Sequence, residues 1–209
     1  MNKAKKTHEK DNDTIVIDTG TGTQTLESIE TFDLVPETDP ILRQLLPEFD
    51  FDNAPINPSD FASSMVETCI KNNGYGLSAN QCGFPYRMFV MGAGTEYVAF
   101  FNPKIVKTEG EAHMKEGCLS FPMLGLSITR PAQVWVEYQD YNGIKREAHY
   151  VGMSARCWLH ELDHMNGIVY TSRVKPLALQ QGMKKRNKID KLISRAQKSG
   201  KKLETVLNV

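Results

Sequence analysis

Hydrophobic residues recur at helical spacing towards both ends of this 209-residue chain. In residues 59–73, Phe61, Met65, Cys69 and Ile70 lie on one face of an expected helix, which Gly74 can end. A second helix is expected over about residues 154–164, and a third over about residues 177–198. The core face of the third helix is expected to comprise Ile189, Leu192, Ile193 and Ala196.

Between these helices, hydrophobic and polar residues alternate as they do in β-strands. Residues 87–106 are rich in strand-forming residues and are interrupted by Gly92 and Gly94. Residues 133–151 alternate on either side of Asn142-Gly143, a dipeptide typical of a tight hairpin turn. A short helix is also expected after Asp39. Because the strands cluster between helices, the pattern predicts an α+β domain and not repeated βαβ units.

The composition is that of an ordinary globular protein, with 40% hydrophobic and 24% charged residues. No stretch approaches the roughly 18–20 apolar residues that span a membrane. The first 13 residues are charged and expected to be disordered, and residues 14–26 alternate weakly, as in a short strand and turn. The N-terminus lacks the apolar stretch of a signal peptide, and the four cysteines are not needed as disulfides. We therefore expect a cytoplasmic protein.

The zero net charge conceals an asymmetry along the chain. Residues 1–60 contain 5 Lys and Arg against 13 Asp and Glu, whereas residues 171–209 contain 11 against 2. A basic tail suggests an anionic partner such as nucleic acid or the ribosome surface. A solvated helix face, partly neutralised by the acidic N-terminus, explains the same pattern. Neither a membrane nor a sequence-specific nucleic acid is expected as a partner.

Residues 160–164 read His-Glu-Leu-Asp-His, which on a helix places His160 and His164 one turn apart on the same face. Such a pair can hold a metal ion, and Glu161 follows the first histidine where its carboxylate can serve as an acid or base. Two ordinary surface histidines would produce the same spacing. A third ligand would strengthen the metal hypothesis.

Glu-Gly-Cys-Leu-Ser at residues 116–120 supplies that third ligand in Cys118. A Cys-His-His set leaves a fourth coordination position open, as in catalytic metal sites. A lone cysteine is more often a small buried hydrophobic residue. The polar neighbours Glu116 and Ser120 weaken that interpretation, and together the two segments predict a metallohydrolase.

Residues 74–81, Gly-Tyr-Gly-Leu-Ser-Ala-Asn-Gln, form a third segment of interest. The segment lacks the spacing and the lysine of a phosphate-binding P-loop. Its small residues are also those of an ordinary turn that ends a helix. Gln81 carries an amide donor, and carbonyl hydrolysis needs donors where negative charge develops.

In their order along the chain, these three segments resemble the motifs of the peptide deformylases: Gly-x-Gly-φ-Ala-Ala-x-Gln, Glu-Gly-Cys-Leu-Ser and His-Glu-x-x-His. The first motif departs once, with Ser78 in place of an alanine. The similarity runs from about residue 74 to 173, and residues 39–43 are similar to the family's first helix. The resemblance implies antiparallel β-sheets around a central helix that carries residues 160–164, followed by a C-terminal helix.

The resemblance also implies roles for individual residues. Cys118, His160 and His164 would bind one divalent metal ion, and Glu161 would be the acid and base. Gln81 and the backbone N–H of Leu119 would form the oxyanion hole. The reaction would remove the formyl group from N-formylmethionyl peptides and release formate. The family points to Fe²⁺ in the cell, with Zn²⁺, Ni²⁺ or Co²⁺ able to occupy the same ligands.

Other residues near these motifs are candidates to bind substrate or to orient ligands. Glu116 and Asp163 can accept the free N–H of a ligating imidazole, or they can form ion pairs with Arg130 or Arg156. Arg130 can contact the peptide or form a structural salt bridge. Trp135 and Trp158 are expected in the core. The residues expected to line the substrate site are Gly74, Tyr75, Gly76, Glu116, Gly117, Arg130 and Cys157.

Two other functions compete with deformylation. A zinc peptidase can use the same helix, but such enzymes usually take a third ligand from downstream, where no comparable histidine motif follows His164. A non-catalytic module could instead bind nascent chains or the ribosome through the basic helix. The predicted organisation is an N-terminal extension over residues 1–30, a catalytic domain over 31–176 and a basic C-terminal helix and tail over 177–209.

Overall fold

The computed structural model describes residues 30–199 of the chain, and from Thr31 onward they belong to one compact unit. The predictions for residues 1–13 and 14–26, and for the tail beyond residue 199, lie outside the described residues. The α-helices are α1 (Pro58–Lys71), α2 (Gly152–Met165) and α3 (Pro176–Lys198), and the 3-10 helices are η1 (Pro40–Arg43), η2 (Ala79–Cys82) and η3 (Tyr170–Arg173). The strands are β1 (Gly76–Ser78), β2 (Met88–Ala93), β3 (Glu96–Glu109), β4 (Ala112–Cys118), β5 (Phe121–Arg130), β6 (Gln133–Gln139) and β7 (Lys145–Val151).

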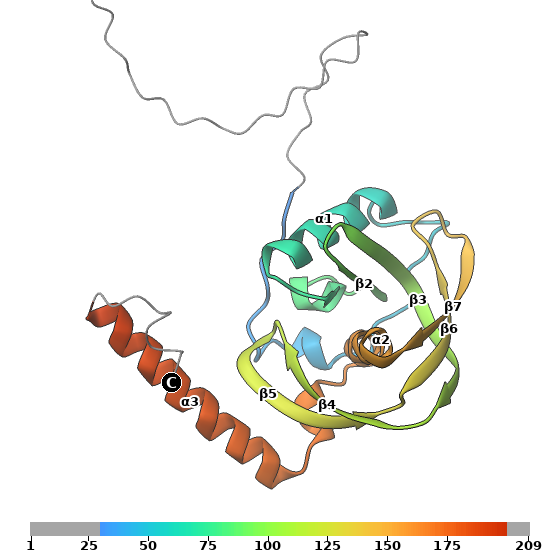
Figure 1. Ribbon diagram of the computed structural model, residues 1–209. Coiled ribbons are helices and arrows are strands. Elements are labelled where there is room, and N and C mark those ends of the chain that lie inside the picture. The colour runs from blue at the N-terminus through green and yellow to red at the C-terminus, as the bar shows by residue number, and fades with distance from the viewer. Residues whose placement is uncertain (1–29, 200–209) are drawn as a thin grey trace, which may run out of the picture. The chain divides into compact units, whose positions relative to one another are not determined.

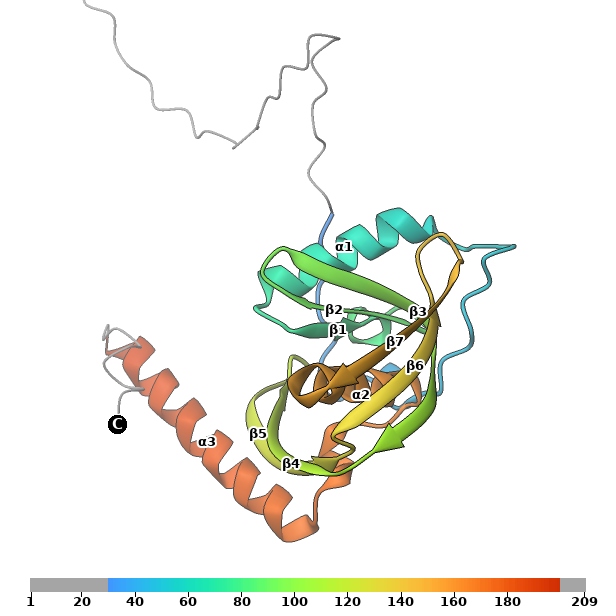
Figure 2. The same ribbon diagram turned by 45° about the vertical axis from the view of Figure 1, so that its right-hand side comes forward.

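The strands form two antiparallel sheets. One has five strands in the order β1-β2-β3-β6-β7, and the other pairs β4 with β5. Helix α2 lies between the two sheets, and α1 covers the outer side of β1 and β2 (Figures 1 and 2). The predicted α+β fold with antiparallel sheets around a central helix is confirmed. The β4-β5 hairpin is an element that the alternation pattern did not reveal.

Helix α1 begins one residue before its expected start and ends at Lys71, and Asn73, with a φ of +55°, takes the left-handed conformation after it in place of the expected Gly74. The Asn57 side chain accepts hydrogen bonds from the N–H groups of Ser59 and Asp60, which satisfies two free donors of the first turn. The buried face contains Phe61, Ala62, Met65, Thr68 and Cys69. Ile70 was expected on this face, but it is 40% exposed and is not among the buried residues of the helix.

Helix α2 follows β7 without a loop, because Gly152 adopts a φ of +58° that turns the chain directly from strand into helix. One face of α2 packs on the five-stranded sheet through Trp158, Leu162 and Met165. The opposite side carries His160, Glu161 and His164, all of which are buried. The apolar face thus anchors the helix so that its polar face is held against β1 and β4.

Trp135 differs from its expected place in the core. It is half-exposed on β6, where it stacks on His149 at 4.1 Å and carries the ammonium group of Lys107 4.5 Å from its ring. The three residues occupy paired positions on neighbouring strands and share one face of the sheet. Trp158, in contrast, is fully buried as expected.

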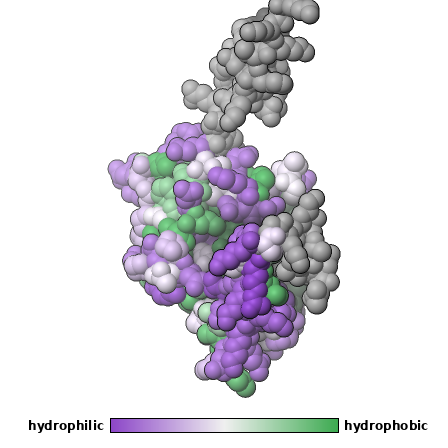
Figure 3. All heavy atoms as spheres, turned by 90° about the vertical axis from the view of Figure 1, so that its left-hand side faces the viewer, coloured by the Kyte–Doolittle hydropathy of each residue, from purple (hydrophilic) through white to green (hydrophobic). Residues whose placement is uncertain are grey.

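Helix α3 packs along β5, where Gly182 allows close approach to Leu124 and Leu126. Of its expected core stripe, Ala196 is buried, and Ile189, Leu192 and Ile193 are half-buried. Hydrophilic side chains run along the outward side of this helix (Figure 3). Within residues 30–199, no helix is both long and apolar enough to cross a membrane.

Candidate metal centre and active site

Three potential metal ligands meet at the end of β4 and on the buried face of α2. The Sγ atom of Cys118 and one nitrogen from each of His160 and His164 lie within 4.8 Å of one another. Cys118 Sγ is 3.3 Å from His164 Nε2. The hairpin of β4 and β5 brings the cysteine to the helix, although the sequence separates it from His160 by 42 positions.

The protonation of this cluster fits a bound cation. Burial lowers the pKa of His160, but interactions with Cys118 and Glu116 outweigh this effect and raise the pKa to about 10. Burial and the positive charges of His160 and Arg130 lower the pKa of His164 well below its usual value, so its imidazole is neutral. Glu116 and the Cys118 sulfur thus favour positive charge at the cluster, and one sulfur with two imidazole nitrogens is a donor set that suits a transition metal.

Glu161 lies next to this cluster and is buried together with it. Its Oε2 atom accepts a hydrogen bond from Ser78 Oγ at 2.6 Å, and burial raises the pKa of its carboxyl group. Gly76 leaves the space that the carboxylate needs, because a Cβ atom there would lie 2.5 Å from Glu161 Oε1. The second glycine of the 74–81 segment therefore allows β1 to approach the helix closely.

Gln81, on η2, directs its amide group towards the same cluster. Its Oε1 accepts the Ser78 N–H at 2.9 Å, and its Nε2 lies 3.0 Å from Ser120 Oγ and 3.5 Å from Cys118 Sγ. These partners settle the orientation of the amide, with its N–H donors facing the cluster. Sequence reasoning missed Ser120 as a partner of Gln81, although the serine belongs to the Glu-Gly-Cys-Leu-Ser segment.

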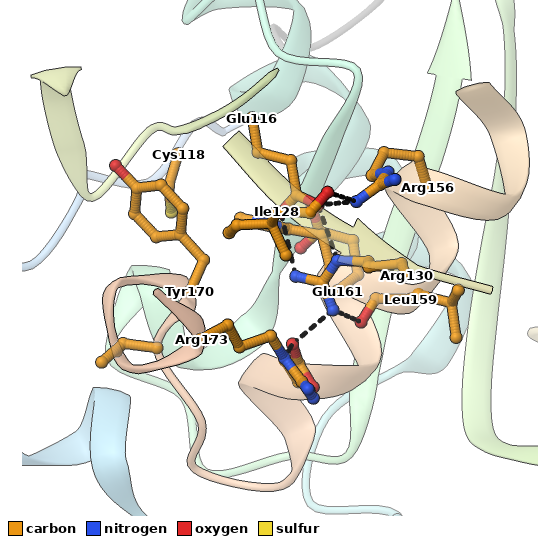
Figure 4. Close-up of polar contacts among 12 residues, drawn as sticks. Glu116, Cys118, Ile128, Arg130, Arg156, Leu159, Glu161, Tyr170 and Arg173 are labelled. Atoms are coloured by element: carbon orange, nitrogen blue, oxygen red, sulfur yellow. Dashed lines mark hydrogen bonds and ion pairs between the residues drawn. The ribbon is translucent and has the colours of Figure 1, made fainter. Parts of the chain in front are cut away.

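Glu116, Arg130 and Arg156 form a buried network of ion pairs next to the cluster (Figure 4). Glu116 accepts hydrogen bonds from Arg130 at 2.7 Å and Arg156 at 2.6 Å, and it lies 3.1 Å from His160 Nδ1. Burial raises the pKa of Glu116, but its bonds to His160, Arg130 and Arg156 outweigh burial and hold the pKa far below its usual range. With Nδ1 oriented by this carboxylate, His160 presents Nε2 to the ligand cluster.

Asp163 does not orient a ligating imidazole, as was considered possible. Its carboxylate pairs with Arg130 at 2.6 Å and with Arg173. Its ion pair with Arg173 directs the Asp163 side chain towards η3. Arg173 was not identified from the sequence, because no local pattern indicates which acid a distant arginine will meet.

We expect Glu116→Gln to destabilise the fold by about 3–5 kcal/mol, because it leaves two buried guanidinium groups with one fewer negative charge. Urea unfolding of the purified protein measures this change. The control is Glu109→Gln, which removes an ion pair to Lys107 that is 56–60% exposed and should cost less than about 1 kcal/mol. Equal losses in the two variants would contradict a special role for the buried network.

Cys118, His160 and Glu161 line a cleft of about 780 Å³. Gly74, Tyr75, Gly76, Glu116, Gly117 and Cys157 line this cleft, as expected from the sequence. Arg130 does not line it, because its guanidinium is held by Glu116 and Asp163, so the structure favours a salt bridge over a contact with the peptide. Arg156 reaches the cleft wall but is paired with Glu116.

Helix α3 forms part of the cleft wall through Gly182, Lys185 and Ile189. From the sequence, this helix was expected to have a core stripe and a basic surface, but not to line the cleft. An isolated glycine inside an otherwise regular helical pattern is a signal of close packing, and Gly182 could have been recognised in this way.

The chain is similar to known deformylases in sequence and in structure. The profile of the family described as polypeptide deformylase matches residues 32–180. A peptide deformylase of Thermotoga sp. is 38% identical over 140 residues, which cover 66% of this chain and 84% of that protein. The peptide deformylase of Legionella pneumophila superposes with a TM-score of 0.69 at 30% identity, covering 79% of this chain and 98% of that one. The Synechococcus elongatus peptide deformylase, solved in complex with actinonin, superposes with a TM-score of 0.68 at 31% identity, covering 77% and 88%.

Proposed function

The chain belongs to the polypeptide deformylase family, and on this premise we propose that Cys118, His160 and His164 hold its metal ion and that Glu161 is its acid and base. As a family member it is a metal-dependent hydrolase that removes the formyl group from N-formylmethionyl nascent peptides. The observation that carries the proposal is the convergence of the three ligand atoms beside a buried carboxylate.

The proposed chemistry assigns one task to each group around the scissile amide. When bound, the metal ion supplies Lewis acidity to the site. Glu161 accepts a proton from the attacking water and later delivers it to the departing α-amino nitrogen. The amide of Gln81 and the N–H of Leu119 donate to the carbonyl oxygen as it becomes negative. The products are formate and a peptide with a protonated N-terminal amine, which takes up both protons of the water, one of them through Glu161, so atoms and charge balance.

The cleft supports a proposal for how the peptide is held. Tyr75, Leu119 and Cys157 provide a largely apolar wall beside the cluster, which suits a methionine side chain. The peptide beyond the methionine would then run along the part of the cleft that α3 lines.

The peptidase and the non-catalytic alternatives receive less support. A peptidase would need a third ligand downstream of His164, whereas a cysteine upstream of the helix lies beside the two histidines. A binding module without catalysis would have no need of an intact acid, base and ligand set. The cysteine ligand must stay reduced to bind a metal, so we place the enzyme in the reducing cytoplasm.

Fe²⁺ is the ion we propose, because it is the ion expected in the cell for this family and accepts a set of one sulfur and two imidazole ligands. Protein purified without oxygen should contain about one iron per chain and release formate from formyl-Met-Ala. Exposure to air should reduce activity, and reloading with Ni²⁺ or Co²⁺ should restore it. Zinc in the anaerobic protein at full activity would overturn the assignment of iron.

We also propose that α3 brings the enzyme to the ribosome, because its exposed lysines give it a strongly basic surface. Replacing Lys188 and Lys191 with glutamate should weaken co-sedimentation with ribosomes at low salt and leave turnover of formyl-Met-Ala unchanged. The matched control reverses Lys71 and Lys145, which lie on α1 and β7. If both variants lose ribosome binding equally, net charge explains the binding and the proposed role of α3 is wrong.

A further inference from the structure

Ser78 occupies the position at which the chain departs from the family motif that it otherwise follows. It ends β1, is fully buried, and directs its hydroxyl at the side chain of Glu161. The distance from Ser78 Oγ to Glu161 Oε2 is 2.6 Å, and the more distant Glu161 carbonyl oxygen lies at 3.4 Å. An alanine at this position would leave the carboxylate without this donor.

Alternate residues of β1 contact the two oxygens of the same carboxylate. Gly76 and Ser78 point to the same side of the strand, as residues two apart do. The missing side chain of Gly76 leaves room for Oε1, and the hydroxyl of Ser78 binds Oε2. One oxygen of Glu161 is thereby hydrogen-bonded and the other lies against Gly76, and both residues line the cleft.

The backbone of Ser78 contacts Gln81, the second proposed catalytic side chain. Its N–H donates to Gln81 Oε1 at 2.9 Å, which turns Gln81 Nε2 towards Cys118 and Ser120. A single residue thus contacts the carboxylate that transfers protons and the amide that stabilises negative charge. Its backbone bond is available to every residue except proline, whereas its hydroxyl bond is specific to serine and threonine.

We propose that the Ser78 hydroxyl is a positioning group for deformylation, which holds the Glu161 carboxylate in the orientation that receives the proton of the attacking water. The proposal rests on the acid and base role of Glu161. A hydrogen bond to a charged group is strong and directional, so the Ser78 hydroxyl limits the rotation of the Glu161 carboxylate. Among the described residues, no other side chain donates a hydrogen bond to this carboxylate. Without it, the carboxylate spends more time in unproductive orientations, which lowers the turnover rate and not the affinity for the peptide.

The test is Ser78→Ala, assayed with formyl-Met-Ala in the metal-loaded enzyme. Alanine stands at this position in the family motif, so we expect the variant to fold. We expect kcat to fall about tenfold, KM to stay within about twofold, and the metal content to stay at one ion per chain. An unchanged kcat would overturn the proposal, and so would an equal fall in metal content, because the hydroxyl would then act on the ligands.

Two further variants separate positioning from a structural role. Thr68→Val removes another fully buried hydroxyl, which donates to the Ser64 carbonyl at 2.6 Å, away from the site. It should lower the melting temperature and leave kcat unchanged. In a Glu161→Gln background, Ser78→Ala should cause no further loss, because there is no carboxylate left to position. A further tenfold loss there would overturn the proposal, whereas full activity of Glu161→Gln alone would instead overturn the proposed acid and base role.

Discussion

Replacing Glu161 with glutamine should lower the rate of formate release from formyl-Met-Ala about a thousandfold. Glutamine has nearly the same shape and can still accept the hydrogen bond from Ser78, but it cannot take a proton from water or return one to the leaving amine. Because the same carboxylate serves both proton transfers, its loss affects attack and departure together. Steady-state kinetics of formate release measures the effect.

Two controls accompany this variant. Metal content should remain at one ion per chain, because Glu161 is not among the three groups whose ligand atoms converge. Glu137→Gln, an exposed position on β6, should leave the rate within about twofold. Glu161→Gln protein that keeps its metal and its full rate would show that another group transfers the proton.

Cys118→Ala should abolish stoichiometric metal binding and, with it, more than about 99% of activity. Two histidines on one helix turn remain, and two ligands hold a divalent ion much more weakly than three. Metal analysis after dialysis measures the loss directly. Retention of one ion per chain would indicate a different third ligand, as in the peptidase alternative.

Cys82→Ala is the matched control for the cysteine variant. Cys82 ends η2 and is half-buried, and burial raises the pKa of its thiol to about 12. Because metals bind the thiolate and not the thiol, this cysteine is a poor ligand at neutral pH. The variant should keep its metal ion and its activity. Loss of metal in both variants would point to a general effect on folding.

The burial of so many polar groups on α2 carries a cost in stability. His160, Glu161, Asp163 and His164 are all less than 8% exposed, and burying charged or polar side chains is unfavourable unless they are paired. Arg130 offsets part of this cost by bridging Asp163 and Glu116. The network of ion pairs therefore lowers the free-energy cost of burying the polar side chains of α2, and it also orients His160.

Local features of the chain were predicted where a short periodic pattern decides them. The bounds of α2 and α3 agree with prediction to within one or two residues, and the Asn142-Gly143 turn joins β6 to β7. The pattern was insufficient at Ile70 and Trp135, which are more exposed than expected. Both are apolar residues at the boundary of a buried face, where periodicity alone does not define the edge of the neighbouring element.

In the proposed site, too, some residues were placed by local spacing and others only by the fold. His160 and His164 share a helix face through local geometry, so their spacing alone placed them together. Cys118 and Gln81 were associated with them through the family motifs, and only the fold shows how β4 and η2 bring them to α2. The partners of Arg130 and Asp163 stayed open until the fold was known, because any opposite charge can in principle pair with them.

The sequence by itself determined the helical and strand periods, the class of metal chemistry and the family, since these depend on residue types at short spacing. The tertiary structure alone decided that Ser78 binds Glu161, that Asp163 meets Arg173 and that α3 lines the cleft. The physical reason is that hydrogen bonds and ion pairs act over a few ångströms. Groups separated by tens of residues come within that range only when the sheets and helices pack.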